Sequence, residues 1–341
     1  MLRKLTYGPD QPSNYSLRTL TNMSFKRVWT RLAVGAVAVA AAFTTATVVT
    51  PTASASPSGV QYVYSPSMGR NIPVDIFGGG GPGAPNLYML DGLDAPDNGN
   101  GWLINTNVQS FFASKHVNII MPFGGAGSFY TNWQANDPTL GRNQWETFLT
   151  VELPAWLNQH GLGSARNGIA GLSMSGGQAL NLASRHPSFF NTAASFSGYP
   201  TPSLAPYSLG MQVAVAKKGG NPLNMWGIYP SPAWFQNDPL LNVLALRGHR
   251  VYVSAGTGGS ARTSADNLLS PNFNALQFVQ QVPLETAANI SSDIYLAAAR
   301  AAGVIVTSNT TEQGVHWWNF WESNLHAAWI DTLAPGLGVQ A

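Results

Sequence analysis

Two serines lie close together in the stretch GIAGLSMSGGQAL, residues 168–180, and either has the setting of a nucleophile. The stretch runs from apolar residues through a turn of small residues into a helix-like segment, a context in which hydrolytic enzymes expose a reactive serine. A nucleophile there needs small residues two positions before and after it. Ser173 lies between Gly171 and Ser175, and Ser175 lies between Ser173 and Gly177, so both fit loosely. Ser173 is slightly favoured because it directly follows the apolar run; a turn without chemistry is the alternative.

A serine nucleophile needs a histidine base and an acid, and on a strand-to-helix turn the acid and then the histidine follow the serine in the chain. Four histidines follow Ser173. His316, in TEQGVHWW, lies between the last expected strand and the last expected helix, which is where the base belongs. His186 ends an expected helix as a cap, His249 opens a strand beside arginines, and His326 lies on a helix face. The alternative for His316 is a loop histidine packed on tryptophan.

The acid is harder to choose. Five carboxylates lie between the serines and the histidine: Asp238, Asp266, Glu285, Asp293 and Glu312. Glu312 shares the loop of the histidine, whereas the acid normally comes from an earlier loop. Glu285, in PLET, begins an expected helix, where a carboxylate would also offset the helix dipole. Asp266 lies in the loop RTSADN. The residue pattern alone leaves the acid open.

Apolar runs and helix-like segments alternate along the chain, which predicts a mostly parallel sheet covered by helices. Strands are expected at residues 60–67, 71–79, 86–92, 117–125, 167–172, 192–198, 250–258 and 304–309. Helices are expected at 101–115, 143–161, 176–187, 285–303 and 317–333. A proline-rich insertion, 199–245, is expected to be rich in loops and to form a lid or binding loop. The pattern indicates a doubly wound α/β fold without a second domain.

Composition excludes several classes of site. Of the 341 residues, 9% are charged, far below the usual quarter, and the formal net charge is +2. No run of lysine and arginine is longer than a pair, and together with the low net charge this argues against nucleic-acid binding. It has no cysteine, which excludes disulfides, thiolate metal sites and cysteine nucleophiles.

The first 55 residues have the pattern of a secretory signal. Basic residues after Met23 precede an uncharged apolar run, residues 32–49, and a small-x-small cleavage pattern ends at Ala55. We therefore expect a signal region at 1–55, whose start is Met1 or Met23, and a domain at 56–341. The protein would be secreted or held in the cell envelope. A retained membrane anchor is the alternative.

Several segments together resemble the antigen 85 mycolyltransferase family, secreted acyltransferases of mycolic-acid bacteria in the esterase D-like superfamily. Eight of them occur in the family's order between residues 60 and 333: SPSMGRNIPV, YMLDGLDAPDNGNGW, MPFGGAGSFYTNW, WETFLTVELPAWL, GLSMSGG, NMWG, NDP and GVHWWNFW. The resemblance implies a single α/β-hydrolase domain with a mostly parallel, eight-stranded sheet and a Ser-Glu-His triad. It implies no cofactor and no metal.

The resemblance also assigns roles to particular residues. The family's nucleophile is the serine of GLSM, here Ser173. Its glutamate precedes the histidine by a spacing that Glu285 matches, 31 residues before His316. The resemblance thus ranks Glu285 above the other acids. The oxyanion hole would consist of the main-chain N–H groups of Leu93 and Met174.

The expected sugar site departs from the family in charge. Asp91 and Trp318 match residues that contact trehalose in the family. Asp94 stands where the family usually has an arginine that helps to hold the sugar, so the local charge is reversed. The disulfide pair of several members is absent, and the segment before Glu285 differs. Tryptophans 226, 234, 317 and 318 are candidates to line a lipid or sugar groove.

The activity that the resemblance implies is acyl transfer. A mycolyl group would pass from trehalose monomycolate, through an acyl-serine, to a second trehalose monomycolate or to cell-wall arabinogalactan. The expected partners are these trehalose mycolates and cell-wall glycolipid acceptors, with association with the cell-envelope surface and fibronectin binding by family analogy. Two other hypotheses stay open: a secreted carboxylesterase whose use of sugar acceptors Asp94 weakens, and a cell-wall adhesion protein.

Overall fold

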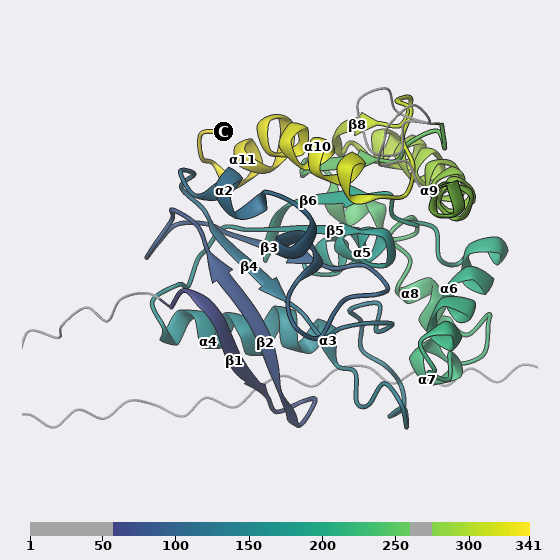
Figure 1. Cartoon of the computed structure of the whole chain (residues 1–341), viewed down its shortest axis with the longest axis horizontal. Helices are drawn as coiled ribbons and strands as arrows, with labels where there is room; N and C mark the ends of the chain where they lie inside the picture. The colour runs from purple at the N-terminus through teal and green to yellow at the C-terminus, as the bar shows by residue number, and fades with distance from the viewer. Residues whose placement is uncertain (1–56, 260–274) are drawn as a thin grey trace, which may run out of the picture. The chain divides into compact units, whose positions relative to one another are not determined.

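A computed structural model describes residues 57–259 and 275–341, and its centre is one sheet (Figure 1). The eight strands in this part of the chain follow the order β1-β2-β4-β3-β5-β6-β7-β8. Their bounds are β1 Gly59–Ser65, β2 Arg70–Phe77, β3 Asn86–Leu90, β4 Asn118–Pro122, β5 Asn167–Leu172, β6 Phe190–Phe196, β7 Arg250–Ser254 and β8 Ile305–Asn309. Each expected strand is present, with ends that differ by a few residues.

The sheet is antiparallel at one edge and parallel elsewhere. β1 and β2 form a hairpin whose register runs from Gly59 opposite Ile76 to Ser65 opposite Arg70, and β2 also pairs antiparallel with β4. All remaining pairs are parallel. Every residue of β3, β4 and β5 is buried, which is typical of parallel strands covered on both faces. The predicted mostly parallel sheet is confirmed.

Helices cover both faces of this sheet. They are α1 Gly101–Asn105, α2 Val108–Phe112, α3 Trp145–Thr147, α4 Leu153–Gln159, α5 Gly176–Arg185, α6 Ala205–Lys217, α7 Leu223–Trp226, α8 Pro232–Gln236, α9 Ala275–Ala302, α10 Trp318–Ala328 and α11 Ala334–Leu337. One buried cluster joins the sheet to α1, α2, α10 and α11, and includes Trp102, Phe112 and Leu325. A second joins it to α4, α5 and α9, and includes Leu157, Leu180 and Tyr295.

Two helical predictions are wrong in detail. The single helix expected at 101–115 is two short helices, because the chain is extended at Thr106, the C-cap of α1. The insertion at 199–245 is not only loops but also holds three helices, α6, α7 and α8. Its prolines misled the prediction, since Pro206 and Pro232 lie in the first turns of α6 and α8, where a proline is tolerated.

The N-terminal predictions lie outside the described residues. These are the signal region at 1–55, its start and its cleavage after Ala55, so the domain boundary at 56 stays a prediction. Within the described residues, no helix is both long and apolar enough to cross a membrane.

Candidate active site

The serine turn connects β5 to α5 through one 3-10 turn, η2, residues Ser173–Ser175. Ser173 has φ of +51°, in the left-handed region that residues with a side chain rarely adopt. A Cβ at Gly171 would overlap the backbone oxygen of Ser175, and one at Gly177 would lie 2.7 Å from the backbone oxygen of Tyr199. Small residues on either side thus allow the strained turn to close, and the turn holds Ser173 at the end of its strand.

The two serines have different surroundings. Ser175 is fully buried, and its Oγ accepts the Leu172 N–H at 2.9 Å and donates to the Leu172 carbonyl at 3.0 Å. Ser173 is only half-buried, and its Oγ lies 2.7 Å from Nε2 of His316. Because the hydroxyl of Ser175 is used within the turn, the geometry favours Ser173 as the nucleophile.

His316 in turn contacts a buried acid. It lies in the loop between β8 and α10, and its Nδ1 is 2.8 Å from Oε2 of Glu285. Both side chains are buried, Glu285 completely. The prediction that Glu285 begins a helix is wrong: α9 extends from Ala275, and Pro283 lies inside it. The dipole therefore gives no account of this carboxylate, whereas its contact with His316 does.

The other acids lie elsewhere. Asp238 is buried and accepts from the backbone N–H groups of Ser203 and Leu240. Glu312 accepts from the side chain of Asn309. Asp266 lies outside the described residues. Among the described candidates, Glu285 alone is hydrogen-bonded to His316.

The second oxygen of Glu285 is held by two groups that the sequence reasoning missed. Its Oε1 accepts from the Oγ of Ser197 at 2.7 Å and from the backbone N–H of Gly256 at 2.5 Å. Ser197 also accepts from the indole N–H of Trp321 at 2.8 Å. A buried carboxylate needs such donors because it has lost its water. The only signal in the sequence was a small residue near the end of an expected strand, 192–198 for Ser197 and 250–258 for Gly256.

Asp91 holds the loop that carries Leu93. Its two carboxylate oxygens accept the backbone N–H groups of Gly92 at 2.7 Å and Gly101 at 2.5 Å. Burial raises the pKa of Asp91 above its usual value, and these two hydrogen bonds oppose that rise. Asp91 lines the same cavity as Ser173, but both of its oxygens already have backbone partners.

The cavity beside Ser173 has a volume of about 670 Å³. Its wall includes Leu93 and Met174, the predicted oxyanion residues, together with His316 and Trp318. Leu284 of α9 and Met211 of α6 also line it. The backbone positions that would stabilise an oxyanion therefore border the same space as the serine.

The four candidate tryptophans divide into two pairs. Trp317 and Trp318 line the cavity. Trp226 and Trp234 are buried core residues whose rings meet edge to face at 5.1 Å. The expectation that the second pair lines a groove is wrong, because these rings fill the interior of the insertion.

Asp94 lies at the edge of this cavity, where it meets α6. Its exposed carboxylate is 3.1 Å from the Nζ of Lys218 and 3.9 Å from that of Lys217. The charge reversal that the sequence indicated is thus offset by two lysines distant in the chain. Lys217 also lines the cavity, so positive charge is still present there.

His186 ends α5 as its C-cap, as expected, and also contacts a buried acid. Its Nε2 is 2.7 Å from Oε1 of Glu146, which also accepts from Arg185 at 2.9 Å. Burial disfavours the charged form of Glu146, but the hydrogen bonds and charges of these two partners outweigh it and lower the pKa of Glu146. The side chains of this cluster contact one another and not Ser173. We therefore expect the cluster to affect the stability of the fold rather than the reaction.

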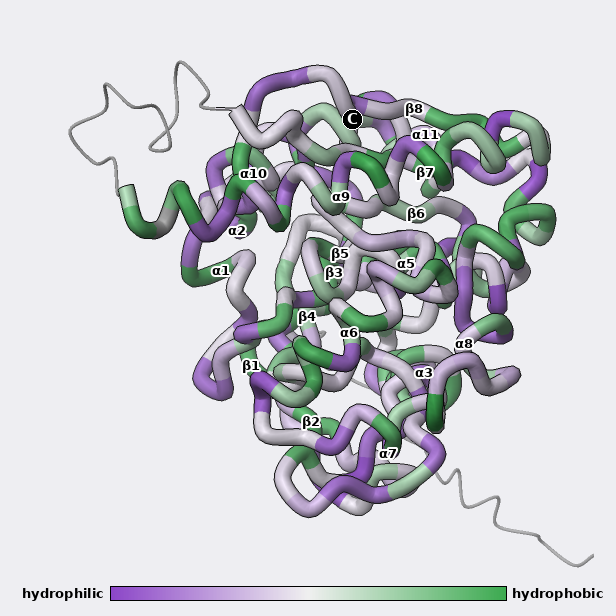
Figure 2. Tube along the Cα trace, turned by 90° about the vertical axis from the view of Figure 1, so that its right-hand side faces the viewer, coloured by the Kyte–Doolittle hydropathy of each residue, from purple (hydrophilic) through white to green (hydrophobic). Residues whose placement is uncertain are grey.

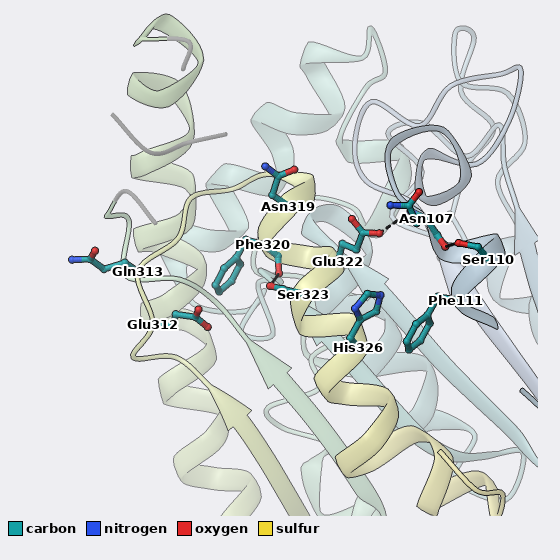
Figure 3. Close-up of a pocket in the computed structure, with 10 residues that line it drawn as sticks. All are labelled: Asn107, Ser110, Phe111, Glu312, Gln313, Asn319, Phe320, Glu322, Ser323 and His326. Carbon is teal, nitrogen blue, oxygen red and sulfur yellow. Dashed lines mark hydrogen bonds between the residues drawn. The ribbon is translucent and has the colours of Figure 1, made fainter. Parts of the chain in front are cut away.

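His326 borders a second cavity, of about 600 Å³ (Figure 3). Its ring stacks on Phe111 with centroids 4.0 Å apart, and burial lowers its pKa. Glu322, in the same wall, accepts the backbone N–H of Asn107 at 2.7 Å. His326 does lie on the face of α10, as expected. The wall of this cavity includes Glu312, one of the candidate acids, but neither Ser173 nor His316.

Comparison with known proteins shows which family this chain belongs to. Residues 65–332 match the profile described as putative esterase. The Mycobacterium avium protein named diacylglycerol acyltransferase/mycolyltransferase Ag85C is 40% identical over 272 residues, which cover 78% of this chain and 74% of the relative. The Ag85A protein of Mycobacterium tuberculosis strain H37Rv is 37% identical over 275 residues, with coverages of 78% and 77%.

Solved structures give the same fold. MPT51 (FbpC1) of Mycobacterium tuberculosis superposes with a TM-score of 0.69 at 28% identity, covering 84% of this chain and 100% of that one. An S-formylglutathione hydrolase of Agrobacterium tumefaciens superposes with a TM-score of 0.55 at 17% identity, with coverages of 79% and 92%, and supports the fold alone. The predicted α/β-hydrolase fold is confirmed.

Proposed function

Because this chain belongs to the antigen 85 family of esterase-like acyltransferases, we propose that it is an acyltransferase that moves mycolyl groups between trehalose esters. The observation that carries the proposal is the hydrogen-bonded chain from Ser173 through His316 to Glu285, which opens on an apolar cavity. The donor is trehalose monomycolate. The acceptor is a second trehalose monomycolate or cell-wall arabinogalactan.

In the first half-reaction, Ser173 attacks the ester carbonyl of the donor while His316 takes the proton of its hydroxyl through Nε2. Glu285 fixes the tautomer of His316 through Nδ1 and stabilises the imidazolium that forms. The N–H groups of Leu93 and Met174 stabilise the oxyanion. His316 then returns the proton to the departing sugar oxygen, and the acyl group stays on Ser173.

In the second half-reaction, a sugar hydroxyl takes the place of the departed sugar. His316 removes its proton, the hydroxyl oxygen attacks the acyl-serine, and the proton returns to Ser173. Transfer rather than hydrolysis requires that the acceptor exclude water from this position. Asp91 and Trp318 would contact the sugar, and the Asp94–Lys217–Lys218 cluster would border it.

The test is product analysis with trehalose monomycolate. The full-length protein should form trehalose dimycolate and free trehalose, whereas Ser173→Ala should form neither. Ser323→Ala, on the exposed face of α10, is the matched control and should retain the wild-type rate. Free mycolic acid without dimycolate would identify a carboxylesterase instead. An unchanged rate in Ser173→Ala would exclude Ser173 as the nucleophile.

We also propose export to the cell envelope, supported by the signal-like pattern in residues 1–55. N-terminal sequencing of protein from the culture medium and the envelope should begin at Ser56. Recovery of the intact chain from the cytosol alone would contradict export. Fibronectin binding stays a prediction of the family resemblance.

A further inference from the structure

The outer face of the β1–β2 hairpin carries two exposed tyrosines. Tyr62 is 70% exposed and Tyr64 is 59% exposed, and Val60 before them is 44% exposed. Because alternate residues of a strand point to the same side, these three side chains share one face of β1, while Val63 and Ser65 are buried on the other. Figure 1 and Figure 2 both place β1 and β2 at the end of the sheet opposite β8. We call Tyr62 and Tyr64 the tyrosine strip.

The tyrosine strip has no partner within residues 57–259 and 275–341. In that part of the chain, neither ring packs on another ring and neither hydroxyl is hydrogen-bonded. Edge strands are usually protected by charged side chains, but the outward positions of β1 carry no charge. Single apolar residues scattered over a surface are ordinary, whereas two rings about 7 Å apart on an edge strand indicate a binding face.

Polar side chains of β2 border the strip. Asn71 lies opposite Tyr64 and Pro73 lies opposite Tyr62, and residues paired in this way share one face of the sheet. Asp75, two positions after Pro73, points to the same face. Asn71 is exposed and Asp75 is half-buried, and neither side chain has a hydrogen-bond partner in the described part of the chain. The electron-rich face of an aromatic ring attracts C–H groups, and amides and carboxylates pair with hydroxyls, so this face offers both kinds of contact that a sugar makes.

The loop between β3 and α1 connects this face to the active-site cavity. A Cβ at Gly124 would lie 3.8 Å from Oδ1 of Asp97 and 4.0 Å from Cγ of Pro73, so the loop meets β2 at Pro73. Pro96, the neighbour of Asp97, lines the cavity. Asp97 and Asn98 are exposed, and their side chains have no hydrogen-bond partner among the described residues. The path from the strip to the cavity therefore runs over Pro73 and past free polar groups.

We propose that the tyrosine strip is a remote subsite for a polysaccharide acceptor, on which the glycan lies while its reacting hydroxyl enters the cavity past Pro96. The inference rests on the proposed function, because it gives a binding place to cell-wall arabinogalactan, the larger of the two acceptors. Area favours a glycan over a protein as the occupant. An aromatic side chain buries about 150–250 Å², so the two partly exposed rings offer about 300 Å². A stable protein interface takes about 800 Å² from each partner.

Glycan binding is measured with the full-length Ser173→Ala protein, so that no transfer takes place. The probe is soluble cell-wall arabinogalactan from which alkali has removed the mycolates, and affinity electrophoresis gives the Kd. Tyr62→Thr with Tyr64→Thr should bind at least about tenfold more weakly, because threonine keeps the strand propensity and removes the rings. Tyr62→Phe with Tyr64→Phe keeps both rings and should bind within about threefold of the parent. The matched control, Ile228→Thr with Ile305→Thr, changes residues that are 74% and 48% exposed and should bind as the parent does.

Activity supplies the second readout. With Ser173 restored, the threonine variant should form trehalose dimycolate at the parent rate, because a trehalose acceptor ends within the cavity. Its KM for arabinogalactan should rise at least about tenfold with kcat unchanged, because a contact remote from the reacting atoms contributes equally to the ground state and the transition state. A single arabinoside, too short to lie on the strip, should be used equally by parent and variant.

Equal arabinogalactan binding by the parent and the threonine variant would overturn the subsite, as would an equal loss in the isoleucine control. An equal loss of dimycolate formation would also overturn it, because the tyrosines would then affect the fold or the relay. A concentration-dependent dimer that the threonine substitutions abolish, without glycan binding by the parent, would identify a second copy as the occupant and overturn the proposal too. Glycan binding through the strip by a parent that forms no dimycolate would refute only the proposed function.

Discussion

Ser197 offers a sharp test of the proposed relay, because it contacts the acid of the relay without itself lining the cavity. Its hydroxyl donates to Oε1 of Glu285 at 2.7 Å, while His316 contacts the other oxygen. Replacing Ser197 by alanine removes this bond and leaves the Trp321 indole N–H without its acceptor. The backbone at this position has a left-handed φ of +48°. The substitution should not change the backbone strain, since serine and alanine both carry a Cβ.

A hydrogen bond to a charged group contributes about 1.5–3 kcal/mol, and each 1.4 kcal/mol corresponds to about tenfold in rate. Glu285 keeps the Gly256 N–H, so the loss should lie at the lower end, about tenfold in kcat. KM for a soluble ester should change less than about twofold, since Ser197 does not line the cavity. The matched control is Ser195→Ala, two residues earlier on β6, whose buried Oγ has no partner among the described residues.

The assay is steady-state hydrolysis of a soluble ester by folded variants, with thermal unfolding measured in parallel. Trp321→Phe removes the indole donor but keeps the Ser197–Glu285 bond, so its effect on kcat should be smaller. The double variant should match Ser197→Ala, because the indole N–H acts through Ser197. A Ser197→Ala enzyme with wild-type kcat, or a loss of kcat as large in Ser195→Ala, would refute the positioning role.

Three further predictions concern stability. Gly171→Ala should destabilise the fold by about 1–3 kcal/mol in urea unfolding, because the new Cβ would overlap the backbone of Ser175; an unchanged midpoint would contradict the close approach. Glu146 has a lowered pKa, so the stability it provides is present above its unfolded pKa of about 4.3 and is lost as pH falls through its lower folded value. Urea unfolding of Glu146→Gln across this range should therefore show a smaller loss in acid than the wild type, and parallel pH curves would oppose this account. Asp94→Asn should shift the free energy of unfolding by less than about 0.5 kcal/mol, since its ion pairs are exposed, and a larger shift in thermal unfolding would show that α6 depends on them.

How much of the site the sequence could predict depended on whether a residue's role was local. Ser173 and His316 were predictable because chain order and the end of an apolar run are local signals. The residue pattern left Glu285 open among five acids, because Pro283 imitated the start of a helix and the burial of the carboxylate is a tertiary property; only the family resemblance ranked it first. The pairing of Asp94 with Lys218 spans 124 residues and depends on where α6 packs, which no pattern in the chain states.

One rule of parallel sheets would have found more of the site. Because parallel strands point the same way, the loops after them meet at one edge of the sheet. In this structure Asp91 follows β3, Ser173 follows β5 and Ser197 follows β6. Gly256 and His316 lie in the loops after β7 and β8. Under the proposed function, these residues would supply the nucleophile, the base, a donor to the acid and a brace for the oxyanion loop. A small or polar residue at the end of a parallel strand is therefore a candidate site residue even without a motif, and Ser197, near the end of the strand expected at 192–198, meets that criterion.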